Sequence, residues 1–194
     1  MDLALPIVAQ VPCAWDSAGF EGPRARLSRI AQQRPVVVLE AARRVGAATR
    51  VRWELARPAR GVLCARAHLP TGVSGCDGDP APRLVHGVRR LLAWRGIGAH
   101  VAWLYGAEAL PLAQVLAPQA IVYDRLEDPG ADAHPRLLRE ATLVFAFPGE
   151  PAEPPSPAAM LGELDRALRR IRGLRARRRA TPASARRLRA ASRS

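Results

Sequence analysis

The chain has 194 residues, and its 30 basic residues, all arginine, outnumber 17 acidic ones to give a formal net charge of +13. Because 48% of the residues are hydrophobic, a core can form, which excludes a wholly disordered protein. Three cysteines without paired spacing (Cys13, Cys64 and Cys76) argue against a disulfide or metal framework. The sequence has no apolar run long enough to span a membrane, so we expect no transmembrane segment. The start MDLALPIVAQVP does not resemble a signal peptide, so we expect a cytoplasmic, reducing setting.

The positive charge is concentrated at the C-terminus. Residues 166–194 hold 12 arginines and no acid, which leaves 18 arginines and 17 acids, a net charge of +1, in residues 1–165. A fold that binds nucleic acid carries its own basic face, so the near-neutral body argues against that function. We expect weak, salt-sensitive polyanion binding by the tail alone. The tail composition equally fits a GC-rich coding sequence that enriches arginine without selection for charge.

The first half of the chain predicts a strand–helix–strand unit followed by a less regular stretch. A buried strand is expected at 5–11, a helix at 23–33 that begins with a proline, and a β-branched strand at 36–39. Such a unit requires a right-handed parallel crossover. Weak alternation predicts further strands at 49–55 and 61–66, and three glycines and three prolines predict a loop at 69–82.

The second half alternates more regularly. Helices are expected at 83–94, 107–116 and 132–141, strands at 100–105, 120–123 and 142–147, and a last helix at 160–174. This alternation predicts an α/β fold: a doubly wound, Rossmann-like parallel sheet with helices on both faces, followed by a C-terminal helix and a basic tail. The expected organisation is a domain at 1–148, a proline-rich linker at 149–157, a helix at 158–174 and a disordered tail at 175–194.

Ligands of such sheets bind beyond the carboxyl ends of the strands, so the residues after each strand are the candidates. These are residues 12–22, Glu40, His68, residues 105–108, residues 124–128 and residues 148–150. Neither the G-x-G-x-x-G fingerprint, nor a P-loop, nor a G-x-S-x-G elbow occurs. We therefore predict no nucleotide cofactor and no metal.

Two of these positions allow a functional and a structural interpretation. Trp15 and Asp16 could stack on a sugar ring and accept its hydroxyl hydrogen bonds, or they could pack under the loop and cap the next helix. His68 is the best placed of four histidines to act as a base, although a lone histidine without a visible partner favours a structural role.

A third position is acidic. Asp124, Glu127 and Asp128 could hold a metal or act as a general base, or they could form a solvated turn before Pro129 and Gly130. The solvated turn is the favoured interpretation of this acidic group.

Several segments, in order, resemble the N-terminal half of bacterial glycosyltransferases of the GT-B fold, of the family 1/4 type. The matching elements are Trp15-Asp16, the helix segment Leu27-Ser28-Arg29-Ile30-Ala31, the strand segment Trp103-Leu104-Tyr105 and the strand end Val122-Tyr123-Asp124. The resemblance covers about residues 5–148. It implies a relationship to nucleotide-sugar-dependent hexosyl transfer in cell-wall or exopolysaccharide synthesis.

The resemblance also implies the roles of particular residues. Asp16 becomes the catalytic candidate, while Trp15, Tyr105 and Asp124 would line the acceptor side of the cleft. His68, Glu127 and Asp128 complete the expected substrate-binding set. The acceptor would be a glycan or a lipid-linked sugar.

Two departures from the family pattern predict that the chain is inactive alone. The family's Gln-Arg-Pro-x-His element is replaced by Glu-Gly-Pro-Arg-Ala at residues 21–25. The resemblance covers only the first of the family's two domains, so a separate donor-domain protein is the expected partner for catalysis. The alternatives are a non-catalytic Rossmann-like binding module and polyanion binding through the arginine-rich tail.

Overall fold

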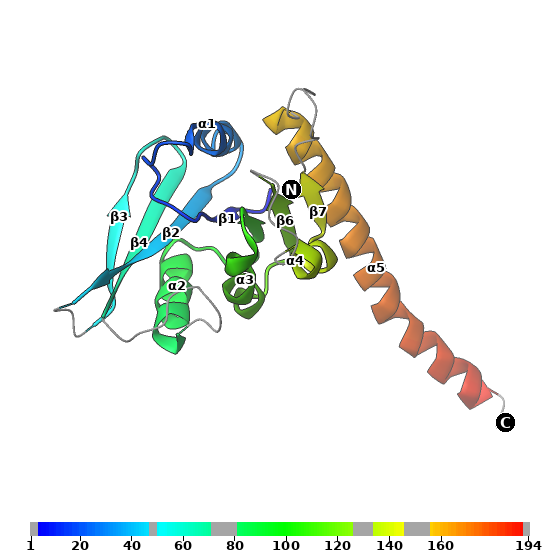
Figure 1. Ribbon diagram of the computed structural model, residues 1–194. Helices are drawn as coiled ribbons and strands as arrows, with labels where there is room; N and C mark the ends of the chain where they lie inside the picture. Colours follow the sequence, from blue (N-terminus) through cyan, green and yellow to red (C-terminus); the bar gives the residue numbers. More distant parts are fainter. Residues whose placement is uncertain (1–3, 47–49, 71–80, 126–133, 146–155, 192–194) are drawn as a thin grey trace.

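Figure 1 shows a computed structural model of the chain, which places one sheet between two layers of helices. The structure describes residues 4–46, 50–70, 81–125, 134–145 and 156–191, with the side chains of the last range described as far as Leu174. The strands are β1 (Ile7–Gln10), β2 (Val36–Val45), β3 (Arg52–Ala56), β4 (Val62–Pro70), β5 (Val101–Leu104), β6 (Ala120–Asp124) and β7 (Leu143–Phe145). The helices are α1 (Glu21–Ile30), α2 (Pro82–Trp94), the short 3₁₀ helix η1 (Ala107–Ala109), α3 (Leu110–Leu116), α4 (His134–Glu140) and α5 (Pro157–Ala191).

The strands form one seven-stranded sheet in the order β3-β4-β2-β1-β5-β6-β7. All neighbouring pairs are parallel except β3 with β4, and β3 is an edge strand. Strands β2, β4 and β3 lie on one side of the central strand β1, and the later strands β5, β6 and β7 lie on its other side. The direction of winding therefore reverses between β1 and β5, which confirms the predicted doubly wound parallel sheet.

The two sides of the sheet are covered by different helices. Helices α1 and α5 pack on the face that carries Ile7, Val38 and Trp103. Helices α2, α3 and α4 cover the opposite face, which carries Val8, Leu39 and their neighbours. Successive residues of a strand point to opposite faces, so each buried strand supplies both layers.

The largest difference from the predicted fold lies between β2 and β4. The described residues between these two parallel strands form no helix, and β3 instead runs antiparallel along the edge of β4. Strand β2 is longer than the predicted 36–39 because its polar second half continues to pair with β4, after an irregularity between Glu40 and Arg43. The same pairing carries β4 to Pro70, into the predicted loop. Residues 71–80 of that loop lie outside the described residues, and its last residue, Pro82, begins α2.

The helix boundaries also differ in places. Helix α1 lies over residues 21–30 rather than 23–33, and the predicted helix at 107–116 divides into η1 and α3. Helix α5 begins at Pro157 and continues to Ala191, beyond the predicted end at residue 174. Alanine and arginine, which dominate this segment, have high helix propensity. Most of the predicted linker at 149–157 lies outside the described residues, and the division into domains stays a prediction.

Candidate functional site

A pocket of about 260 Å³ lies at the carboxyl ends of β1, β2 and β4, next to the start of η1. It adjoins the point between β1 and β5 where the winding reverses, which is where doubly wound sheets bind ligands. The floor of the pocket is apolar, and its polar side chains come from β1, β2 and η1. The lining residues are Gln10, Val11, Pro12, Leu39, Glu40, Ala41, Ala42, Arg44, Leu69, Glu108 and Ala109.

Gln10 is the most unusual residue of this pocket. It is the last residue of β1, paired in register with Leu39 on one side and Leu104 on the other, and only 5% of it is exposed. Its Nε2 atom is buried and finds no hydrogen-bond partner among the described residues. A buried amide donor without a partner costs about 1–3 kcal/mol, so an acceptor oxygen supplied by a ligand would be favoured here.

Glu40 connects the pocket to the loop that follows β1. Its carboxylate accepts a hydrogen bond from the backbone N–H of Trp15 and pairs with Nε of Arg66 at 3.0 Å. Arg66 in turn lies 3.8 Å from Glu54, whose carboxylate is 3.0 Å from Nε2 of His68. The network fixes the loop over the sheet, and it gives His68 a carboxylate partner that the sequence did not reveal.

Asp124 does not lie in the solvated turn that the sequence favoured; it is the last residue of β6 and its side chain is buried. The carboxylate is 1% exposed, forms an ion pair with Arg26 of α1 and accepts a hydrogen bond of 3.0 Å from Nε1 of Trp103. Burial raises the pKa of Asp124, and Arg26 and Trp103 oppose that rise. Both donors are intramolecular, so Asp124 ties α1 to β5 and β6.

Tyr105 lies beside this ion pair in an aromatic cluster. Its ring meets Phe20 edge to face at 5.6 Å, and Phe20 meets Trp15 in the same way at 6.3 Å. Burial, followed by the charge of Asp124, raises the pKa of Tyr105. The hydroxyl is buried and has no hydrogen-bond partner with good geometry in the described part of the chain.

The structure therefore brings most of the sequence candidates to one end of the sheet. The rings of Trp15 and Tyr105 both contact Phe20, and Asp124 is close enough to Tyr105 for its charge to raise the pKa of that residue. Trp15 is 8% exposed, whereas Asp16 is exposed on the same loop. His68 reaches that loop only through the Glu40 network. Glu127 and Asp128 lie outside the described residues.

None of those candidates lines the 260 Å³ pocket, and side-chain alternation explains why. Tyr105 and Asp124 project from the same sheet face as Trp103, towards α1, whereas Gln10 shares the face of Val8. Glu40 and Glu108 were among the candidates predicted to follow strands, whereas Gln10 and Arg44 were not. The available signal was the amide that ends the otherwise apolar run Ile-Val-Ala-Gln.

Among the described residues, no group of three or more His, Cys, Asp or Glu side chains could hold a metal ion. Nor does any helix in that part of the chain have the length and apolar character needed to cross a membrane.

Comparisons with known proteins give similarity to solved structures only. No protein-family model matches the chain, and no curated protein matches it. One similar structure is described as trehalose-6-phosphate from E. coli bound with UDP-2-fluoro glucose (TM-score 0.46, 10% identity, covering 73% of this chain and 40% of that one). Another is an alpha,alpha-trehalose-phosphate synthase (UDP-forming) from Burkholderia xenovorans in complex with glucose-6-phosphate (TM-score 0.48, 12% identity, 74% and 40%). The chain thus spans 40% of the length of each. Its own strand order defines a Rossmann-like α/β domain.

Proposed function

We propose that the chain is the acceptor-side domain of a glycosyltransferase-type protein and that the pocket at the carboxyl ends of β1, β2 and β4 binds a sugar. The observation that carries the proposal is the buried, partnerless amide of Gln10 in a pocket beside the winding reversal. The ordered resemblance of Trp15-Asp16 and of Val122-Tyr123-Asp124 to glycosyltransferases supports the same assignment.

The lining of the pocket suits a hydroxyl-rich ligand. Sugar hydroxyls both donate and accept hydrogen bonds, and they meet an amide donor at Gln10, a carboxylate at Glu108 and a guanidinium at Arg44. The apolar floor formed by Leu39, Leu69 and Ala109 suits the carbon face of a sugar ring. A sugar phosphate would gain an additional charged hydrogen bond from Arg44.

In this proposal Asp16 is the acid–base residue and works at the same end of the sheet. Its loop is held by the hydrogen bond from the Trp15 backbone N–H to Glu40, which also lines the pocket. Asp16 is exposed, as a group that must reach a bound acceptor requires. The reaction would be hexosyl transfer from a nucleotide sugar to a glycan or lipid-linked acceptor, in cell-wall or exopolysaccharide synthesis.

Transfer also requires a donor-binding domain across the cleft, because catalysis depends on holding both reactants in place. We therefore expect no sugar transfer by the chain alone from any nucleotide sugar. Transfer that is lost in Asp16→Ala would overturn the expectation of inactivity and would establish Asp16 as catalytic.

Binding can be tested without catalysis. Saturation-transfer difference NMR with a panel of hexoses and hexose phosphates should give signals for at least one sugar, and Gln10→Leu should weaken its binding about tenfold, the value of one hydrogen bond of about 1.4 kcal/mol. Gln32→Leu makes the same chemical change at an exposed position after α1 and should leave binding unchanged. Absence of binding to the whole panel would favour the non-catalytic binding module with another ligand.

A further inference from the structure

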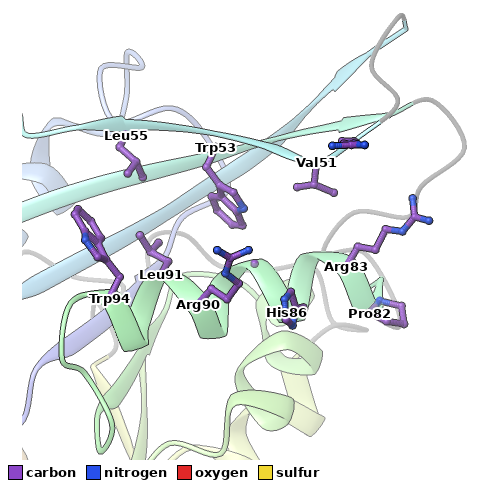
Figure 2. Close-up of a pocket in the computed structure, with 11 residues that line it drawn as sticks. Val51, Trp53, Leu55, Pro82, Arg83, His86, Arg90, Leu91 and Trp94 are labelled. Atoms are coloured by element: carbon purple, nitrogen blue, oxygen red, sulfur yellow. The ribbon is translucent and has the colours of Figure 1, made fainter.

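A second, larger concavity lies between helix α2 and the edge strand β3, with a volume of about 910 Å³. Figure 2 shows side chains from the two elements facing each other across it. We call it the α2–β3 groove, and it shares no lining residue with the sugar pocket proposed above. Its lining residues are Arg50, Val51, Trp53, Leu55, Pro82, Arg83, His86, Gly87, Arg90, Leu91 and Trp94.

The charged side chains that line the described part of the groove are all basic. Arg50, Arg83 and Arg90 are exposed, and none of them pairs with an acid among the described residues. Among the described residues, no acid lines the groove. Glu54 lies between two groove residues of β3, but it pairs with His68 and Arg66 instead. The near-neutral body thus presents three unneutralised guanidiniums around one concave surface.

Two indole rings complete the groove. Trp94 is 62% exposed at the end of α2, an unusual exposure for a large apolar side chain. Trp53 is partly buried and lies so close to α2 that a Cβ atom on Gly87 would approach its Nε1 to 2.6 Å. The guanidinium of Arg95 lies over the Trp94 ring, 5.6 Å from its centre, at a distance typical of a cation–π contact.

We propose that the α2–β3 groove binds a nucleoside phosphate, with the base stacked on Trp94 and the phosphate paired with Arg90. An exposed indole favours a flat aromatic ring, and stacking of one base contributes about 1–3 kcal/mol. Guanidinium groups are well suited to phosphate oxygens. Arg90 and Trp94 are four residues apart on α2 and therefore lie on the same face of the helix, and Figure 2 shows Arg90 between the Trp94 and His86 side chains.

The dimensions and the charge distribution favour a small nucleotide over a nucleic-acid strand. The volume falls within the range of about 300–1,000 Å³ that is typical of small-ligand pockets. A strand needs a basic track that extends beyond one pocket, whereas residues 1–165 carry a net charge of only +1. The site is independent of the proposed sugar site and does not depend on glycosyl transfer.

Intrinsic tryptophan fluorescence of the full-length chain tests the proposal directly. ADP and UDP should quench the emission saturably, after correction against free N-acetyltryptophanamide, because a stacked base quenches an indole. Trp94→Leu should remove most of this quenching, and it should not impair folding because the ring is largely exposed. Arg90→Gln should weaken binding of ADP about tenfold through loss of a charged hydrogen bond. Arg29→Gln, an exposed arginine on α1, is the matched control and should change nothing.

Several results would contradict the proposal. Adenosine that binds as tightly as ADP would remove the role of the phosphate, and pyrophosphate that competes as well as ADP would remove the role of the base. An oligothymidylate that binds when mononucleotides do not would show a nucleic-acid groove instead. Absence of saturable quenching by both nucleotides would refute the site itself. Gln10→Leu should leave nucleotide binding intact, so failure of the sugar site and of this site are distinguishable.

Discussion

Replacing Arg26 by methionine should destabilise the fold in a pH-dependent manner. The substitution keeps much of the apolar stem but removes the cation that pairs with Asp124, whose side chain is 1% exposed, while that of Arg26 is 10% exposed. Breaking a buried ion pair by removing one partner costs about 3–5 kcal/mol. We expect about 3 kcal/mol at pH 8, the lower end, because the Trp103 indole still donates to the carboxylate.

The pH dependence follows from the pKa of Asp124. Burial already raises this pKa above its ordinary value of 3.8, and Arg26 is the first of the groups that oppose the rise. Without Arg26 the folded-state pKa rises further, so the protonated form is favoured in the folded state. In the Arg26→Met variant, the stability contributed by protonated Asp124 is then fully present below the unfolded-state pKa of Asp124, and it is lost as the pH rises through the folded-state pKa. The cost of Arg26→Met should therefore be small at about pH 4 and largest at about pH 8.

Urea unfolding followed by tryptophan fluorescence at the two pH values measures this cost. Arg29→Met, an exposed position on the same helix, should cost less than about 0.5 kcal/mol at either pH. Adding Asp124→Asn to Arg26→Met should recover most of the loss at the higher pH, since no buried charge remains. An equal cost at both pH values, or no recovery in the double variant, would refute the reasoning.

Three further outcomes follow from the packing and the charge. Leu164→Ala, at a fully buried position of α5, should lower the free energy of unfolding by about 2–5 kcal/mol in urea titrations, and a loss below about 1 kcal/mol would show that α5 does not dock. Gly87→Ala should destabilise because its Cβ would meet the Trp53 ring, whereas Gly162→Ala, with open space around its Cβ position, should stabilise by about 0.5–1 kcal/mol in the same assay. Removing residues 175–194 should leave the melting temperature nearly unchanged. Removing residues 166–194, which carry all 12 arginines of the tail, should abolish low-salt retention on heparin, and retention by residues 1–165 alone would place polyanion binding in the body.

The sheet was predictable because its central strands are short apolar runs. Val36-Val37-Val38-Leu39 and Ile7-Val8-Ala9 are buried on both faces, and this pattern is typical of parallel strands between two helix layers. The hairpin of β3 and β4 was harder to predict. Strand β3, Arg-Trp-Glu-Leu-Ala, is largely exposed, and the end of β4 pairs with the polar second half of β2, which lies beyond the predicted strand at 36–39.

The candidate site was predictable only in part. Sequence order placed Tyr105 and Asp124 at the carboxyl ends of their strands, where the structure has them, whereas Glu40, expected just after a strand, lies inside the longer β2. It could not show that Arg26, which is 98 positions away in the sequence, is the ion-pair partner of Asp124. Nor could it show that Gln10 lacks a partner, because that depends on three strands meeting in register.

The central claim is that a sugar binds at the carboxyl ends of β1, β2 and β4. Amide chemical-shift mapping by two-dimensional NMR, with the full-length chain titrated by a hexose phosphate, tests it most directly. The account predicts saturable shifts concentrated at Gln10, Ala41, Arg44 and Ala109, with little change at Trp94. Shifts confined to the α2–β3 groove, or no shifts with any hexose phosphate tested, would contradict it.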